Sequence, residues 1–473
     1  MLPALGLQGT VLLGLALSGL AAAGTVLLRQ RGVEGPGVVG AILSGDDVRA
    51  GEPRVDEHTE ATTTEAAGAL GAAMALFAFT AWGFLLIYDR TLSFVVGRSL
   101  DARATSGAVF LLALALGVFL SSALTDVLSG PFVALAGTLG AASTTAYLSM
   151  YLVAQVARLY LKLLPHLERP GLSQLPAALA SAALMFPSVL LLGATLPLLA
   201  QAARARRRSA IGVTTYIAIG IVLADLAVGL LMIPVFGLRR SQGCVSALGL
   251  WAAILFLLFA RFRQRALRTT IVLVLTGLIV IFIGWPASWD PRLVAAGLYR
   301  YGTRALSRYG SVEGYLAARR SNEVLFYKEG ADASVMIERT LQAAKGLPPV
   351  EGLSLTVDGK VEAATGDDIR TQVLQAHIPI LVHGPTDKVL LIDLLNGVTA
   401  GSVLRHPVKS LTVLEREPVL FEASQFFSSY NYSPTRDSRL VPVRDGAMSS
   451  SSRGSTHGCR RARRSSRPKE WLG

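Results

Sequence analysis

Charged residues are scarce in this 473-residue chain: they make up 16% of it, whereas soluble domains carry about 25%. Hydrophobic residues make up 52%. Together these values exclude an ordinary soluble protein and indicate that much of the chain lies in lipid. Cysteine is also rare. Cys244 and Cys459, the two in the chain, are far apart and indicate neither a disulfide framework nor a metal site.

The formal net charge is +13, but the distribution of that charge argues against a nucleic-acid partner. Seven basic residues and one acid lie in the tail 447–473. Much of the remaining positive charge is arginine beside apolar segments, which is where membrane proteins concentrate it. We therefore expect the chain to associate with a lipid bilayer and not with nucleic acid.

Apolar runs long enough to cross about 30 Å of hydrocarbon recur through residues 1–286. They predict a transmembrane helical domain of about seven or eight spans: 4–28, 66–88, 106–125, 131–157, 173–202, 211–237, 244–260 and 269–286. The first run is either a retained helix, which we favour, or a signal peptide ending near the small residues 21–24. Prolines at 187 and 197 suggest that the fifth run is interrupted or re-entrant.

One carboxylate, Asp225, lies inside a predicted span. An ionised carboxylate there is costly unless it is paired or hydrated. One interpretation is a proton or cation site. The other is a structural carboxylate that faces the bundle interior and bonds to a neighbouring helix.

The residues after 286 have a different pattern. Residues 287–320 indicate a connecting helical segment. Residues 321–380 predict a small β-hairpin and helix unit, with Asp358-Gly359 as a two-residue type I′ turn and Pro379 ending the helix that begins at 367.

Residues 381–446 predict the beginning of a nucleotide-type α/β domain. A continuous apolar strand at 388–392 leads into a loop and helix, and a second strand at 410–414 ends in Glu415. A further helix and a third strand, 439–443, follow. This order is that of a Rossmann-like half-domain. Glu415 lies 18 residues after Gly397, near the spacing at which a carboxylate accepts hydrogen bonds from a ribose diol.

These motifs together resemble the aminopropyltransferase (spermidine/spermine synthase) family, and specifically its bacterial members fused to a membrane domain. The segments that carry the resemblance are 187–197, 215–237, Phe326–Gly330, Thr371-Gln372, His377–Pro379, Leu404–Pro407, Leu414–Pro418 and Arg444–Gly446. The resemblance implies a fold with a polytopic α-helical membrane domain, the small β-hairpin unit and a truncated Rossmann-like domain of the class I methyltransferase type.

The family transfers an aminopropyl group from decarboxylated S-adenosylmethionine, a co-substrate, to a diamine. The resemblance implies that Gln372 and His377 line the nucleoside and diamine side, that Gly397 belongs to the nucleoside loop, that Glu415 holds the ribose and that Asp445 contacts the adenine amine. It implies neither a resident cofactor nor a metal. Structural alternatives remain open for these residues: a helix cap, a polar helix face, a solvated strand end and a turn.

Two departures from the family pattern predict impaired chemistry. Asp393 and Leu395 stand where the family has glycines. No Asp follows Asp445, so the family's catalytic acid is missing, and we assign no catalytic residue. The basic tail 447–473 is expected to be disordered, and its composition is typical of a frameshift or truncation; an anionic-lipid anchor is the other interpretation.

The predicted function is therefore that of a membrane-bound spermidine synthase-like protein with a small-molecule polyamine or nucleoside substrate. Whether this chain is an active enzyme stays open. The alternative is a transporter or scaffold with a non-catalytic nucleoside- or polyamine-binding module. We expect a bacterial-type inner membrane, with the soluble part in the cytoplasm, and leave homo-oligomerisation open.

Overall fold

The structure is a computed structural model that describes residues 57–124, 130–167, 174–205, 210–260, 262, 265–342 and 350–443. The predicted span 4–28, Asp445 and the basic tail lie outside these ranges. The chain divides into two compact units: residues 1–336 with 356–361, and residues 337–355 with 362–473. Each unit is described by itself.

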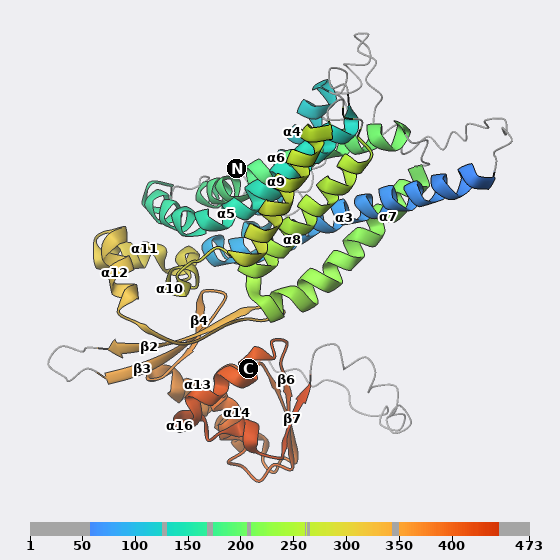
Figure 1. The fold of residues 1–473 in the computed structure, drawn as a ribbon. Helices are drawn as coiled ribbons and strands as arrows, with labels where there is room; N and C mark the ends of the chain where they lie inside the picture. Colours follow the sequence, from blue (N-terminus) through green and yellow to red (C-terminus); the bar gives the residue numbers. More distant parts are fainter. Residues whose placement is uncertain are drawn as a thin grey trace, which may run out of the picture. The chain divides into compact units, whose positions relative to one another are not determined.

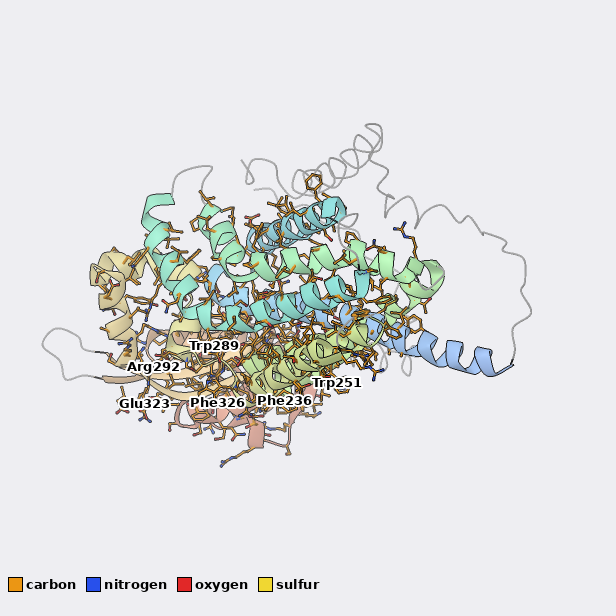
Figure 2. All side chains as sticks on the ribbon, turned by 45° about the horizontal axis from the view of Figure 1, so that its top comes forward. Phe236, Trp251, Trp289, Arg292, Glu323 and Phe326 are labelled. Atoms are coloured by element: carbon orange, nitrogen blue, oxygen red, sulfur yellow. The ribbon has the colours of Figure 1, made fainter. Side chains whose placement is uncertain are left out.

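Long apolar helices make up most of the first unit (Figure 1). They are α3 (Glu57–Val96), α4 (Leu100–Leu124), α5 (Pro131–Leu167), α6 (Leu175–Ala205), α7 (Ala210–Ala224), the π-helix η1 (Asp225–Met232), α8 (Ile233–Leu258) and α9 (Arg265–Gly284). Within the described residues, six helical segments are long and apolar enough to cross a membrane. Large apolar side chains such as Phe236 and Trp251 are exposed on these helices, as expected of a lipid-facing surface (Figure 2).

The fifth of these segments, Gly212–Leu258, turns back on itself at Gly237. Before the turn, Gly71 packs against Tyr216 and Gly83 against Val228, so α7 and η1 run in the same direction as α3. After the turn the order along α3 is reversed, since Val245 also packs against Gly83 while Gly249 packs against Thr80. Figure 1 shows the resulting sharp corner between α7 and α8. The segment therefore runs along α3 in both directions, and the two spans predicted at 211–237 and 244–260 stay a prediction.

The prediction that the proline-containing run is interrupted or re-entrant is wrong. Pro187 and Pro197 both lie inside α6, which is continuous over 31 residues. Close packing accompanies this continuity: Gly117 of α4 meets the backbone of α6 at Leu190, and Gly193 of α6 meets the backbone of α4 at Leu114. Neighbouring helices commonly allow proline inside a transmembrane helix in this way.

A buried carboxylate caps the helix that follows the turn. Glu329, 7% exposed, ends β1 (Glu323–Glu329) and accepts a hydrogen bond from the backbone N–H of Leu238, the first residue after Gly237. The Tyr327 hydroxyl donates to the other carboxylate oxygen at 2.6 Å. Burial, followed by the negative charge of Glu329, raises the pKa of Tyr327 well above its ordinary value. The Gly237 turn is thus fixed by a charge from the extramembrane strand.

Short helices and a four-stranded sheet follow the last span. The helices are α10 (Pro291–Val294), α11 (Leu298–Tyr309) and α12 (Val312–Arg320). The sheet has the order β1-β2-β3-β4, with β2 at Ser334–Gln342, β3 at Val350–Val357 and β4 at Lys360–Ala364. Asp358 (φ 46°) and Gly359 (φ 82°) join β3 to β4, which confirms the predicted type I′ turn. Asp358 also pairs with Arg98 at 2.5 Å.

The second unit contains a parallel sheet in the order β5-β6-β7. Its strands are β5 (Lys388–Ile392), β6 (Ser410–Leu414) and β7 (Leu440–Val443), and Val389 is paired with Leu411, which is paired in turn with Leu440. The other elements are α13 (Asp367–His383), α14 (Val398–Val403), α15 (Val419–Ala423), η2 (Ser424–Phe427), α16 (Ser428–Asn431) and η3 (Pro434–Arg436). Leu411 and Val413 pack with Ala376, Ala400 and Val403 in its core.

The prediction that Pro379 ends the helix is wrong, because α13 continues through it to His383. A proline inside a helix removes one backbone hydrogen bond, here to the carbonyl of Gln375. Pro379 and Gln375 both lie on the exposed side of α13, where water can satisfy that carbonyl. The helix instead stops at Gly384, whose φ of 85° suits glycine.

Replacing Gly237 with alanine should destabilise the first unit. The backbone there (φ 76°, ψ 168°) suits glycine alone, and a Cβ would come 2.6 Å from the Glu329 carboxylate. We expect a loss of about 1–3 kcal/mol, measured as a lower unfolding midpoint of the full chain in detergent. Gly277→Ala in α9, where an added Cβ meets nothing within 4 Å, is the matched control. An unchanged midpoint for Gly237→Ala would contradict the capped turn.

Candidate functional site

The loop between β5 and α14 has an unusual backbone. Three of its residues have positive φ: Asp393 (66°), Leu395 (50°) and Gly397 (79°). The N–H of Asp393 still donates to the Leu414 carbonyl at 3.0 Å, so the loop leaves directly from the end of the β5–β6 pairing. Side chains other than glycine rarely adopt this conformation, and each such residue stores strain that its surroundings must hold.

The carboxylate of Glu415 holds this loop against the end of β6. Glu415 is 3% exposed; one oxygen accepts from the backbone N–H of Leu394 and the other from that of Glu417, each at 2.8 Å. A carboxylate has about four acceptor positions, so these two bonds leave capacity on both oxygens. Glu415 therefore holds the loop with only part of its acceptor capacity.

Several effects act on the acidity of Glu415. Burial, the largest, raises the pKa of Glu415 above its ordinary value, and the two backbone N–H groups oppose this rise. The negative charges of Asp393 and Glu417 then raise the pKa further. Three carboxyl groups, those of Asp393, Glu415 and Glu417, thus lie close together at the end of β6.

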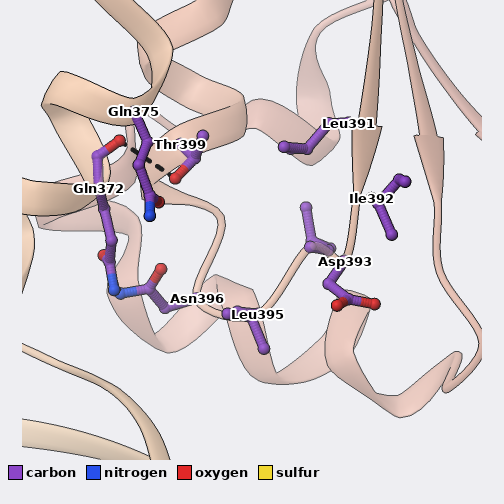
Figure 3. Close-up of a pocket in the computed structure, with 9 residues that line it drawn as sticks. Gln372, Gln375, Leu391, Ile392, Asp393, Leu395, Asn396 and Thr399 are labelled. Carbon is purple, nitrogen blue, oxygen red and sulfur yellow. Dashed lines mark hydrogen bonds between the residues drawn. The ribbon is translucent and has the colours of Figure 1, made fainter.

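A cavity of about 230 Å³ lies beside this loop (Figure 3). Its lining residues come from α13, the end of β5, the loop and α14: Gln372, Gln375, Leu391, Ile392, Asp393, Leu394, Leu395, Asn396 and Thr399. The Asn396 amide donates to the side-chain oxygen of Gln372 at 2.9 Å, and the Thr399 hydroxyl donates to the Gln372 carbonyl at 3.1 Å. These bonds tie α13 to the loop and to α14, and they fix one wall of the cavity.

The buried side-chain amide of Asn431 also supports the loop. Asn431 is 1% exposed, and its side-chain NH₂ donates to the carbonyls of Asn396 (2.7 Å) and Ser424 (2.8 Å). A Cβ on Gly397 would come within 3.0 Å of this amide nitrogen and 3.1 Å of Pro434. Glycine is therefore required at 397 both by its positive φ and by the space available.

The predicted site residues are distributed unevenly about this cavity. Gln372 lines it, while Gly397 and Glu415 shape and hold its loop. His377 does not line it; its Nδ1 lies 2.7 Å from Nε2 of His406, and the two rings contact each other. Asp445 lies outside the described residues. The role assigned to each by resemblance stays a prediction.

Sequence reasoning missed several lining residues as site residues, most clearly Gln375, Asn396 and Thr399. The available signal was their position: Asn396 and Thr399 follow a buried-type parallel strand, where ligands of α/β proteins usually bind. Among the described residues, no group of three or more His, Cys, Asp or Glu is placed to hold a metal ion. The polar side chains that line the cavity are amides, a hydroxyl and a carboxylate.

Comparison with known proteins finds relatives that share one name. The chain is 24% identical over 128 residues to a polyamine aminopropyltransferase of Archaeoglobus fulgidus, covering 25% of this chain and 48% of that protein. It is 29% identical over 102 residues to the polyamine aminopropyltransferase of Serratia proteamaculans (21% and 36% covered). It is 31% identical over 100 residues to that of a Ruegeria species (20% and 35% covered).

The resemblance to polyamine aminopropyltransferases is therefore real but partial. The chain spans less than half the length of the curated relatives it matches. No protein-family model matches the chain. The same chain also contains the apolar helices of the first unit, which are long enough to cross a membrane.

The raised pKa of Glu415 predicts a pH-dependent stability of the second unit. Because the folded unit binds this proton more tightly than the unfolded chain does, protonation stabilises the fold, and that stabilisation is lost as the pH rises through the raised pKa. We expect amide exchange in β5 and β6 of the full chain, corrected for intrinsic rates, to show protection that falls as the pH rises above the ordinary titration range of a glutamate.

Glu415→Gln should remove this pH dependence and also lower protection overall, because an amide cannot accept from both backbone N–H groups. Glu422→Gln, which removes an exposed carboxylate of α15, should keep the pH dependence of the parent. Equal pH profiles for the parent and Glu415→Gln would refute the assignment.

Proposed function

We propose that this chain is a membrane-anchored, spermidine synthase-like protein whose second unit is a Rossmann-like domain that binds a nucleoside. The support is threefold: six segments suited to crossing a membrane, a parallel sheet whose first loop borders a cavity, and partial similarity to polyamine aminopropyltransferases. The single observation that carries the proposal is Glu415, buried at the end of β6 and bonded to the loop that follows β5.

In this proposal the nucleoside lies across the carboxyl ends of β5 and β6. Glu415 accepts hydrogen bonds from the ribose hydroxyls with its remaining lone pairs. Gln372, from α13, faces the same cavity and binds the polar part of the substrate. The proposal carries over the roles that the resemblance implies for Asp445, contact with the adenine amine, and for His377, the diamine side, although His377 contacts His406 and does not line the cavity.

The family reaction that we carry over is aminopropyl transfer from decarboxylated S-adenosylmethionine to a diamine. The neutral amine nitrogen forms a bond to the carbon beside the sulfonium, the carbon–sulfur bond breaks, and methylthioadenosine leaves. The ammonium form of the diamine first gives a proton to water, which leaves the neutral amine that attacks, and the electron pair of the broken carbon–sulfur bond goes to sulfur. Acceptors such as Asp393 and Gln372 line the cavity and would orient that amine.

We further propose that transfer by this chain is slow. Asp393 and Leu395 hold positive φ and both line the cavity, so side chains stand at two places where a glycine backbone would let the nucleoside approach closely. The proposal places the first unit in a bacterial-type inner membrane and the second unit in the cytoplasm. Polyamine and nucleoside substrates occur in that compartment.

The double variant Asp393→Gly/Leu395→Gly tests this account. We expect the parent chain, in membranes given decarboxylated S-adenosylmethionine and putrescine, to release little methylthioadenosine. The double variant should bind methylthioadenosine about tenfold more tightly, because the two side chains that prevent a close approach of the nucleoside to the loop are gone. Binding is measured by calorimetry on the purified full chain.

Matched substitutions away from the loop provide the control. Ser428→Gly/Ser429→Gly, in α16, adds the same number of glycines without touching a lining residue. Rapid turnover by the parent, abolished by Glu415→Ala, would contradict the slow-transfer proposal while leaving nucleoside binding intact. Failure of the parent and the double variant alike to bind methylthioadenosine would contradict the function itself.

A second candidate is a transporter with a non-catalytic binding module, and one observation favours it. Asp225 begins the π-helix η1 within a span, and the Trp82 indole N–H donates to its carboxylate at 3.2 Å. Intramembrane carboxylates and π-helical segments both occur often at functional sites. Putrescine flux into proteoliposomes that is lost in Asp225→Asn would support this candidate. Flux that is absent, or equal in parent and variant, would remove it.

A further inference from the structure

Helix α11 carries one face of arginines and no acidic residue. Arg300, Arg304 and Arg308 repeat every four residues, so they share one side of the helix, and all three are exposed. The opposite side, with Leu298, Gly302 and Ala305, is buried. We call the three exposed side chains the α11 arginine stripe.

The buried side of α11 packs where two candidate spans end. Gly302 lies against Leu161 and Leu164 of α5, and the α5 span is Pro131–Leu164. The Tyr299 ring packs on Gly97, the residue that follows the last residue of the α3 span, Val96. Contact with the terminal residues of two spans sets α11 at the depth where hydrocarbon gives way to lipid headgroups.

Neighbouring side chains fit the same depth. Tyr309, 41% exposed, lies beside the Arg308 guanidinium, whose carbon is 5.7 Å from the ring centre. Lys162, next to Leu161 on α5, is exposed. Tyrosine and basic residues concentrate at membrane interfaces, where aromatic rings sit among headgroups and cations attract anionic lipids.

We propose that the α11 arginine stripe binds the phosphate groups of anionic membrane lipids. Guanidinium groups hold phosphate oxygens through paired N–H donors, and three of them at four-residue spacing can contact adjacent headgroups. The position of α11 at the span ends selects lipid over other polyanions, because a bilayer presents its phosphates at that depth. The stripe thereby anchors the segment that leads from the last span to β1.

The test uses the purified full chain in detergent, titrated with phosphatidylglycerol or phosphatidylcholine, with bound lipid counted by native mass spectrometry. The variant is Arg300→Gln/Arg304→Gln/Arg308→Gln. We expect its phosphatidylglycerol affinity to fall roughly fivefold per arginine, about a hundredfold in all, with phosphatidylcholine binding unchanged. The corresponding triple lysine variant, which keeps the charge, should retain most of the affinity.

Two further comparisons make the result decisive. Lys388→Gln/Arg405→Gln/Lys409→Gln removes the same charge from exposed positions of the second unit and should bind phosphatidylglycerol as the parent does. Glycerol phosphate, the headgroup without acyl chains, should compete weakly. The proposal is overturned if the glutamine variant binds like the parent, if the control variant loses as much affinity, or if glycerol phosphate binds the stripe as tightly as the lipid.

Discussion

The interaction on which the second unit's site depends is the pair of hydrogen bonds from Leu394 and Glu417 to one buried carboxylate, that of Glu415. These bonds join the loop after β5 to the end of β6. They act together with the bond from the Asp393 N–H to the Leu414 carbonyl and the bond from Asn431 to the Asn396 carbonyl, and so help to hold positive φ at Asp393 and Leu395 on either side of Leu394. Asn396 belongs to the same loop, and its bond to Gln372 forms part of the cavity wall. The position of that wall therefore depends on how Glu415 holds the loop.

The first unit contains a similar interaction, in which a buried glutamate accepts a hydrogen bond from a backbone N–H group. At Gly237 the chain reverses direction, and Glu329 accepts from the free N–H of Leu238. The first N–H groups of a helix lack partners within it and carry partial positive charge, so a carboxylate stabilises them. In both units a buried glutamate at the end of a β-strand fixes the backbone of a neighbouring connection.

Local sequence patterns were enough to predict much of the fold. The Asp358-Gly359 turn and the strands β5, β6 and β7 follow from residue type and apolar runs alone. Pro379 and the prolines of α6 misled the prediction because the cost of a helical proline depends on what surrounds it. Exposed carbonyls in α13 and tight packing between α4 and α6 offset that cost, and neither can be read from one segment.

The candidate site, like the fold, could be predicted only in part from the sequence. Glu415 could be singled out from its spacing to Gly397, whereas its two backbone donors depend on how the loops meet. The contact between His377 and His406 joins positions 29 residues apart, and no periodicity indicates it. The Arg98–Asp358 ion pair, between residues 260 positions apart, was equally beyond local reasoning.

The central claim is that Glu415 recognises a ribose diol while it holds the loop. The most direct measurement compares the affinity of the full chain for methylthioadenosine and for its 2′,3′-dideoxy analogue. Hydrogen bonds to a buried carboxylate predict that the analogue binds at least roughly tenfold more weakly. Equal affinities for the two compounds would contradict the account.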